Sequence, residues 1–286
     1  MTDVGFFAAF GLWRNPMIVA LLSAGLCAFV GVFIVLKRVV FVSAALSQLS
    51  GIGVALFFWL AALVGLDAHN PPLWANPTWF ALLFAVLGSA LFSLNLEHRR
   101  LSGERVIGLG YLVASSLVLV VLNSPRIAQE AHEVNDLLYG NAVAVAPEQI
   151  WIMASVAAAV FATHALFHKE LVFVSFDPEM ARTLGYRTGA WHLILFVSIG
   201  VAISVATRAI GALPVFAFMI IPPAAALLLA TRLRGVFALA VGIALASAAL
   251  GYYVSFVLSL PTGASMVVVA ALFLVPGLIN LARGVK

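Results

Sequence analysis

Polar side chains interrupt the apolar stretch Phe41–Leu56 and are the first candidates for a chemical role. The stretch reads FVSAALSQLSGIGVAL and has no charged residue, yet it carries Ser43, Ser47, Gln48 and Ser50. Helical residues three or four positions apart lie on one face, so the three serines follow one stripe of a helix. Hydroxyl and amide oxygens are weak neutral ligands, which suit a hard or hydrated divalent ion better than a tightly held Zn²⁺.

Two interpretations of this stripe remain open. Small residues spaced four apart, such as Ser43, Ser47 and Gly51, let two membrane helices pack closely, and hydrogen bonds between buried side chains add about 0.6 kcal/mol on average. The alternative is that the stripe lines a route through the membrane. We favour this alternative for Gln48, because an amide costs more to bury than a hydroxyl group. We therefore predict a translocation path at Ser43, Ser47 and Gln48, with helix packing as the competing explanation for the serines.

A second group of candidates is acidic and includes a histidine. Its members lie close together in a polar segment and are Glu130, His132, Glu133 and Asp136. Carboxylate and imidazole groups are common metal ligands, so this segment is a candidate for receiving a metal ion. We favour the alternative that it is solvated charge that holds a partner protein.

Composition identifies the class of protein. Of the 286 residues, 64% are hydrophobic and 9% are charged, and the mean hydropathy is +1.14. Soluble domains carry about 25% charged residues. Because long uncharged stretches recur along the chain, we predict a multi-pass membrane protein without a sizeable soluble domain.

An apolar helix of about 20 residues is long enough to cross a bilayer. Nine stretches of this kind are present, at 17–36, 39–64, 77–96, 106–122, 149–167, 189–207, 211–231, 235–258 and 263–281. Their connections are short, so we predict an all-α bundle of nine spans that forms one transmembrane domain over residues 1–286. Pro214, Pro222 and Pro223 predict a broken helix in the seventh span.

Basic residues indicate the orientation, because they gather on the cytoplasmic side of membrane proteins. One set of alternate connections holds twelve of the fifteen: Lys37, Arg38, Arg99, Arg100, Arg105, Lys169, Arg182, Arg187, Arg232, Arg234, Arg283 and Lys286. The other set holds Arg14, Arg126 and Arg208. We therefore predict a cytoplasmic C-terminus, an N-terminus outside, and membrane lipid around the bundle; we predict no nucleic-acid partner.

The sequence excludes an ATP-binding P-loop. This loop requires a Gly-Lys pair, whereas the three lysines follow Leu36, His168 and Val285. The predicted spans also hold few of the ionisable groups that ion-coupled transporters and pumps keep there. No span holds a Ser–His–Asp set, which argues against a membrane-embedded hydrolase. What remains is a pore-forming subunit powered from outside, or a non-transporting scaffold.

The longest predicted cytoplasmic loop, at about 170–188, contains a short helix signature. In SFDPEMARTLGYRTG, Asp177 suits an N-cap, Pro178 suits the first turn, and Glu179 complements the positive end of the helix dipole. Gly185 suits a helix stop. A short capped helix in this loop is either a contact point for a partner or a surface linker, and the motif alone leaves both open.

This loop and four further segments together resemble the permeases of zinc/manganese-type ABC importers. SFDPEMARTLG is similar to the coupling helix of that family, which is close to F-D-P-E-x-A-x-x-L-G. The other segments match family motifs in the same order and are ALSQLSGIGVAL, LLYGNAVAVAPEQI, RAIGALPVFAFMIIPPAAA and LPTGASMVVVAALF. The resemblance covers roughly residues 17–281, and it is specific because the motifs are colinear.

The resemblance implies an importer subunit that holds no cofactor of its own and is not an enzyme. ATP is expected on cytoplasmic ATP-binding subunits, and the substrate is expected to be a divalent metal ion (zinc, manganese or iron) delivered by an extracytoplasmic metal-binding protein. A homodimer of permeases in a bacterial inner membrane is implied as well. The positions that would couple to the ATPase are Asp177, Pro178, Glu179, Ala181, Leu184 and Gly185.

One departure from the family pattern leaves the substrate open. The second span of the family usually reads G-D-A-x-S-H, whose Asp and His lie on one helix face and can hold a metal together. Ala44 and Gln48 stand at these two positions here, and only Ser47 matches. A permease of the same fold for another substrate, such as a metal chelate, and a non-transporting scaffold therefore remain alternatives.

Overall fold

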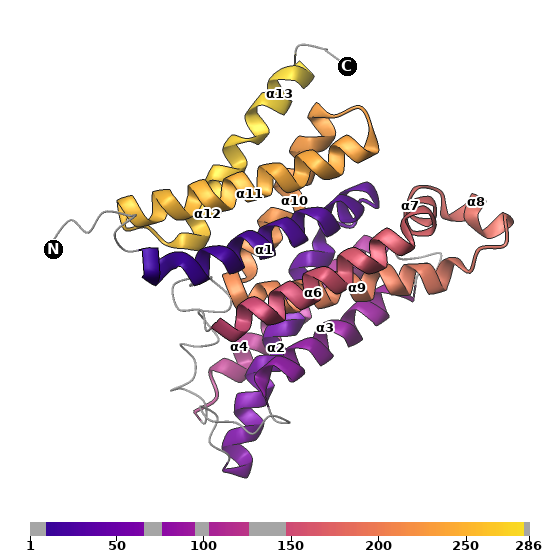
Figure 1. Cartoon of the computed structure of the whole chain (residues 1–286). Coiled ribbons are helices and arrows are strands. Elements are labelled where there is room, and N and C mark those ends of the chain that lie inside the picture. Colours follow the sequence, from indigo (N-terminus) through magenta and orange to yellow (C-terminus); the bar gives the residue numbers. More distant parts are fainter. Residues whose placement is uncertain (1–9, 66–75, 95–102, 126–146, 283–286) are drawn as a thin grey trace.

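The computed structural model describes residues 10–65, 76–94, 103–125 and 147–282, and within these ranges the regular structure is entirely α-helical (Figure 1). The helices are α1 (Phe10–Leu36), α2 (Phe41–Val64), α3 (Pro77–Ser93), α4 (Gly103–Leu122), α6 (Pro147–Leu166), α7 (His168–Phe176), α8 (Pro178–Thr183), α9 (Thr188–Ile210), α10 (Ala212–Leu229), α11 (Leu233–Leu258), α12 (Thr262–Leu272) and α13 (Leu274–Ala282).

The nine predicted spans all correspond to apolar helices in the described part of the chain. Eight segments there are long and apolar enough to cross a membrane, and the last of them, Thr262–Ala282, consists of α12 and α13. The ninth is α3, whose 17 residues lie at the lower end of the roughly 17–25 that a span needs. The prediction of an all-α, multi-pass membrane protein is thereby confirmed.

The predicted break in the seventh span is wrong, because α10 is continuous from Ala212 to Leu229 with Pro222 and Pro223 inside it. Each interior proline removes one backbone N–H and leaves the carbonyl four residues earlier without its helical partner. For Pro223 that carbonyl belongs to Met219. A neighbouring helix covers it: a Cβ added to Gly31 of α1 would lie 2.3 Å from the Met219 oxygen.

The bundle consists of two groups of helices joined by α9. In one group α1 packs against α10 and α11, and α11 packs against α12; in the other, α2 packs against α3 and α4. Helix α9 contacts α1, α2, α3, α6 and α10, and Figure 1 shows α2 crossing behind it. Glycines permit the closest approaches, as at Gly53, where an added Cβ would lie 2.4 Å from the carbonyl oxygen of Phe80.

Two short helices project from one end of this bundle, between α6 and α9 (Figure 1). Helix α7 follows α6 after a break at Phe167, whose backbone leaves the helical region. Helix α8 begins at Pro178 and ends at Thr183, and the chain then turns through Gly185 into α9. The short helix that the sequence predicts after Asp177 is therefore present.

Candidate translocation and coupling sites

The serines of the stripe on α2 are buried, and two of them form hydrogen bonds with α9. The Ser50 and Ser204 hydroxyl oxygens are 3.2 Å apart, and the Thr207 hydroxyl donates to the Ser47 oxygen over 3.4 Å. Ser43 donates to the backbone carbonyl of Val40 over 3.0 Å. Within the single chain, this face of α2 is therefore a helix contact that satisfies its own polar groups.

Gln48 lies on a neighbouring face of the same helix. Its side chain and that of Ala44 are both half-buried, whereas Ser43 and Ser47 are fully buried. The spacing of four residues places Ala44 and Gln48 one above the other. The structure thus separates the three predicted pathway residues into two fully buried serines and one half-buried amide.

We expect Ser50→Ala to have a small effect. The change removes the hydrogen bond to Ser204 and leaves one hydroxyl unpaired in a contact between helices, which should cost about 0.6 kcal/mol. The midpoint of thermal unfolding in detergent should fall by roughly 1–2 °C. A large loss of transport with unchanged stability would instead assign this face to the pathway.

The capping geometry of α8 agrees with its sequence signature. The Asp177 side chain accepts from the Met180 backbone N–H over 2.9 Å, Pro178 occupies the first turn, and Gly185 adopts a left-handed φ of 85°. Ala181 is fully buried and attaches α8 to the bundle. Apolar side chains on the same unit are exposed, among them Leu184 at 61%.

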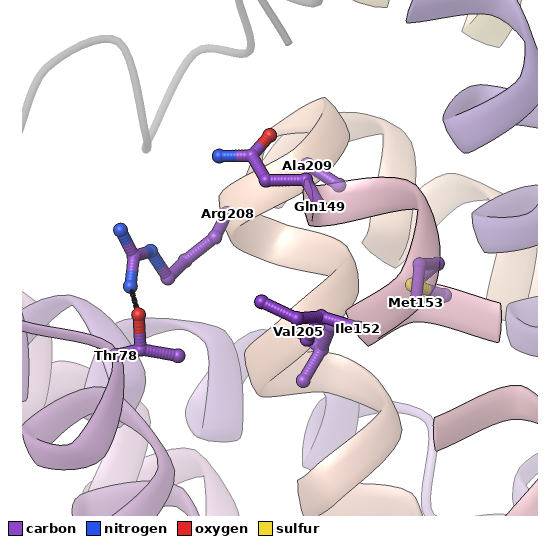
Figure 2. Close-up of a pocket in the computed structure, with 7 residues that line it drawn as sticks. All are labelled: Thr78, Gln149, Ile152, Met153, Val205, Arg208 and Ala209. Carbon is purple, nitrogen blue, oxygen red and sulfur yellow. Dashed lines mark hydrogen bonds between the residues drawn. The ribbon is translucent and has the colours of Figure 1, made fainter. Parts of the chain in front are cut away.

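A small cavity lies at the opposite end of the bundle (Figure 2). It has a volume of about 50 Å³, and its polar lining groups are Thr78 at the start of α3, Gln149 at the start of α6 and Arg208 near the end of α9. The Arg208 guanidinium donates to the Thr78 hydroxyl, which in turn donates to the Asn76 side-chain oxygen over 2.6 Å. Among the predictions from sequence, Arg208 counts only as a loop charge. Its position at the end of a span, three residues before Gly211, is the sequence feature that could have identified it as part of a site.

A buried histidine also went unrecognised in the sequence. His164 of α6 is fully buried, its Nδ1 lies 2.9 Å from the Val160 carbonyl oxygen, and its ring contacts Phe29 and Phe33. The segment HALFH places His168 four residues later, which is a metal-ligand spacing on a continuous helix. Helix α6 ends at Leu166, however, and His168 is exposed.

The described residues contain no group of three or more His, Cys, Asp or Glu side chains that could hold a metal ion. The acidic candidates Glu130, His132, Glu133 and Asp136 lie outside the described residues. Their assignment as metal ligands or as a partner contact stays a prediction.

The sequence of this chain is similar to those of several curated membrane transport proteins. Among curated proteins, the chain is similar to the manganese import system permease protein ScaB of Streptococcus pneumoniae, with 26% identity over 92% of this chain and 88% of that protein. A probable iron transport system membrane protein of Haemophilus influenzae is 27% identical over 90% of this chain and 86% of its own length.

Solved structures show the same fold. The structure described as PsaBC from Streptococcus pneumoniae in complex with Fab matches with a TM-score of 0.78 and 23% identity, covering 95% of this chain and 94% of that one. An inward-facing conformation of a putative metal-chelate type ABC transporter matches with a TM-score of 0.69 and 17% identity, over 93% and 83% of the two chains. The model of the ABC 3 transport family matches residues 9–280, and this chain belongs to that family.

Proposed function

We propose that this chain is the membrane permease subunit of an ABC importer that carries a divalent metal ion into the cytoplasm. The observation that carries the proposal is the family match over residues 9–280, together with relatives named as manganese and iron transport permeases. Manganese is the first ion to test, and zinc and iron follow. The 286 residues form one transmembrane domain in this proposal, in a bacterial inner membrane with the C-terminus cytoplasmic.

ATP hydrolysis belongs to separate cytoplasmic subunits in this proposal, and α8 is their contact. The apolar side chains of Phe176, Met180 and Leu184 support this role, because all three are exposed on or beside α7 and α8, which project from the bundle. Asp177 and Gly185 define the two ends of α8. The buried Ala181 would carry the movement of α8 into the bundle.

The proposed complex contains two permeases and an extracytoplasmic metal-binding protein. Helix α6 supports the pairing: Ala154, Ala158 and Ala162 are spaced four apart on a face that is partly or fully exposed in the single chain. Small residues at this spacing let membrane helices pack backbone to backbone. In such a pair, Gln48 would face the pathway, since it is the accessible polar group on α2.

The test is transport by the complete complex in proteoliposomes. With the ATPase subunits inside and the binding protein outside, ATP should drive Mn²⁺ uptake, and the purified permease alone should hydrolyse no ATP. Uptake of a metal chelate without uptake of free Mn²⁺, Zn²⁺ or Fe²⁺ would favour the chelate alternative. A complex that binds all its partners but transports neither a free metal ion nor a metal chelate would favour a scaffold.

We expect Glu179→Arg together with Gly185→Pro to uncouple the ATPase. Proline fixes φ near −65°, whereas Gly185 adopts 85°, so the turn after α8 cannot form. No transmembrane helix is changed, and membrane insertion should therefore be normal while uptake falls by about tenfold or more. Gly189→Ala is the matched control, because an added Cβ there meets nothing within 4 Å. Normal uptake by the double variant would make the loop a linker.

A further inference from the structure

A hydrogen bond joins the end of α1 to the beginning of α9, at the end of the bundle where α7 and α8 project. The Lys37 ammonium nitrogen lies 3.0 Å from Nε2 of His192, and 155 residues separate the two. Both side chains are half-buried. A lysine ammonium group can only donate, so Nε2 accepts and the histidine proton is on Nδ1.

Lys37 belongs to a closed turn that sets the direction of α2. Arg38 adopts a left-handed φ of 59°, the Arg38 N–H donates to Val35, and the Val39 N–H donates to Ile34, both over 3.1 Å. This is the Schellman pattern of helix ends. Helix α2 starts at Phe41, directly after this turn. Because the turn is short and fully bonded, a displacement of Lys37 displaces the start of α2.

His192 lies at the start of α9, which is attached to α7 and α8 by several contacts. The Tyr186 N–H donates to the Ala181 carbonyl over 3.0 Å, which fixes the turn after α8. The ring of Tyr186 packs on Phe173 of α7 with centroids 5.6 Å apart, and Trp191 packs on Phe167 at 5.2 Å. His192 follows Trp191 in the chain. A displacement of α8 is therefore carried to His192 through paired rings and backbone hydrogen bonds.

We propose that the Lys37–His192 hydrogen bond transmits the movement of α8 to α2, which makes both side chains positioning residues for the coupling of ATP hydrolysis to transport. This inference rests on the proposed function, in which α8 contacts the ATPase and the accessible Gln48 face of α2 meets the pathway. The side-chain hydrogen bonds between α9 and α2 in the described residues lie elsewhere, at Ser204 and Thr207, close to the opposite end of α9. The lysine–histidine bond thus provides a separate connection close to the driving helix.

The experiment measures how many ATP molecules are hydrolysed per Mn²⁺ ion transported by the complete complex in proteoliposomes. His192→Leu removes the acceptor, and Lys37→Met removes the donor while keeping an apolar chain of similar length. Each change should raise the ATP-to-ion ratio about fivefold or more. His192→Gln, which keeps an acceptor, and Lys37→Arg, which keeps a donor, should remain within about twofold of the wild-type ratio. Arg38→Gln is the matched control, because it removes an exposed charge from the same turn.

A double-mutant cycle gives the decisive comparison. If the bond is the connection, Lys37→Met combined with His192→Leu should be no worse than either single change. Equal uncoupling by His192→Leu and His192→Gln, additive effects in the double variant, or wild-type ratios in both single variants would each overturn the inference. These outcomes leave the proposed function standing, since the wild-type complex still transports. Absence of ATP-driven uptake by the wild-type complex would instead overturn the proposed function and the inference with it.

Discussion

Replacing Gly31 by alanine should lower the free energy of unfolding by about 3 kcal/mol, at the upper end of what overpacking costs. The added Cβ would lie 2.3 Å from the Met219 carbonyl oxygen and 2.7 Å from its Cα. These are backbone atoms of α10, so no side-chain rotation relieves the clash, and α1 and α10 must move apart. Both helices belong to the main core, where Phe33 and Phe218 are fully buried.

The measurement is thermal unfolding of the purified protein in detergent, where Gly31→Ala should lower the midpoint by roughly 6–12 °C. Gly242→Ala is the matched control: this glycine also lies in a membrane-spanning helix, and an added Cβ there meets nothing within 4 Å. It should be neutral or slightly stabilising, since alanine is the better helix former. Equal midpoints for the two variants would contradict the close contact between α1 and α10.

The same contact covers one of the two carbonyls that the prolines of α10 leave without a helical partner. The sequence identifies Pro222 and Pro223 and predicts lost hydrogen bonds, which is correct chemistry. It does not identify Gly31, 192 positions before Pro223, as the residue whose missing side chain lets α1 approach the Met219 carbonyl.

The spans and helix α8 were predictable from sequence because their signals are local. Twenty apolar residues specify a span by length alone, and Asp177 satisfies an N–H only three residues away. Contacts between spans carry no such signal, because lipid and protein interiors are equally apolar and hydropathy does not distinguish the face that packs from the face that meets lipid. The Lys37–His192 bond has no sequence signal either, because each residue is an ordinary polar group at the edge of a span and 155 residues separate the two.

For the candidate pathway residues as well, the sequence does not show which helix face packs against another helix. Helical spacing correctly groups Ser43 with Ser47 and separates them from Gln48, but it does not say which group meets another helix. Ser47 and Ser50 meet α9, where Thr207 and Ser204 provide the matching hydroxyls. Only the three-dimensional arrangement leaves Gln48 and Ala44 on the accessible side.

Restoring the family pair with Ala44→Asp and Gln48→His should create a metal site on α2. The two positions are four residues apart and half-buried, so a carboxylate and an imidazole would project together from one face. A metal that binds the folded state only, at 100 times its Kd, stabilises that state by about 2.7 kcal/mol. Thermal unfolding of the purified double variant should therefore shift upward by roughly 5–10 °C when Mn²⁺ or Zn²⁺ is added.

The stripe beside it offers a matched control with the same chemistry. Ser43→Asp with Ser47→His places an identical pair four residues apart on the buried face, where Ser47 meets α9. A carboxylate there costs about 2.5–3.5 kcal/mol, and the packed helix leaves no room for an ion and its remaining ligands. This variant should lose stability with or without metal. If the Ala44/Gln48 variant does not respond to metal, its face of α2 is closed by protein in the assembled permease, and Gln48 is a packing residue. If the Ser43/Ser47 variant responds to metal, α2 must turn to expose its serines, and the pathway runs along the stripe.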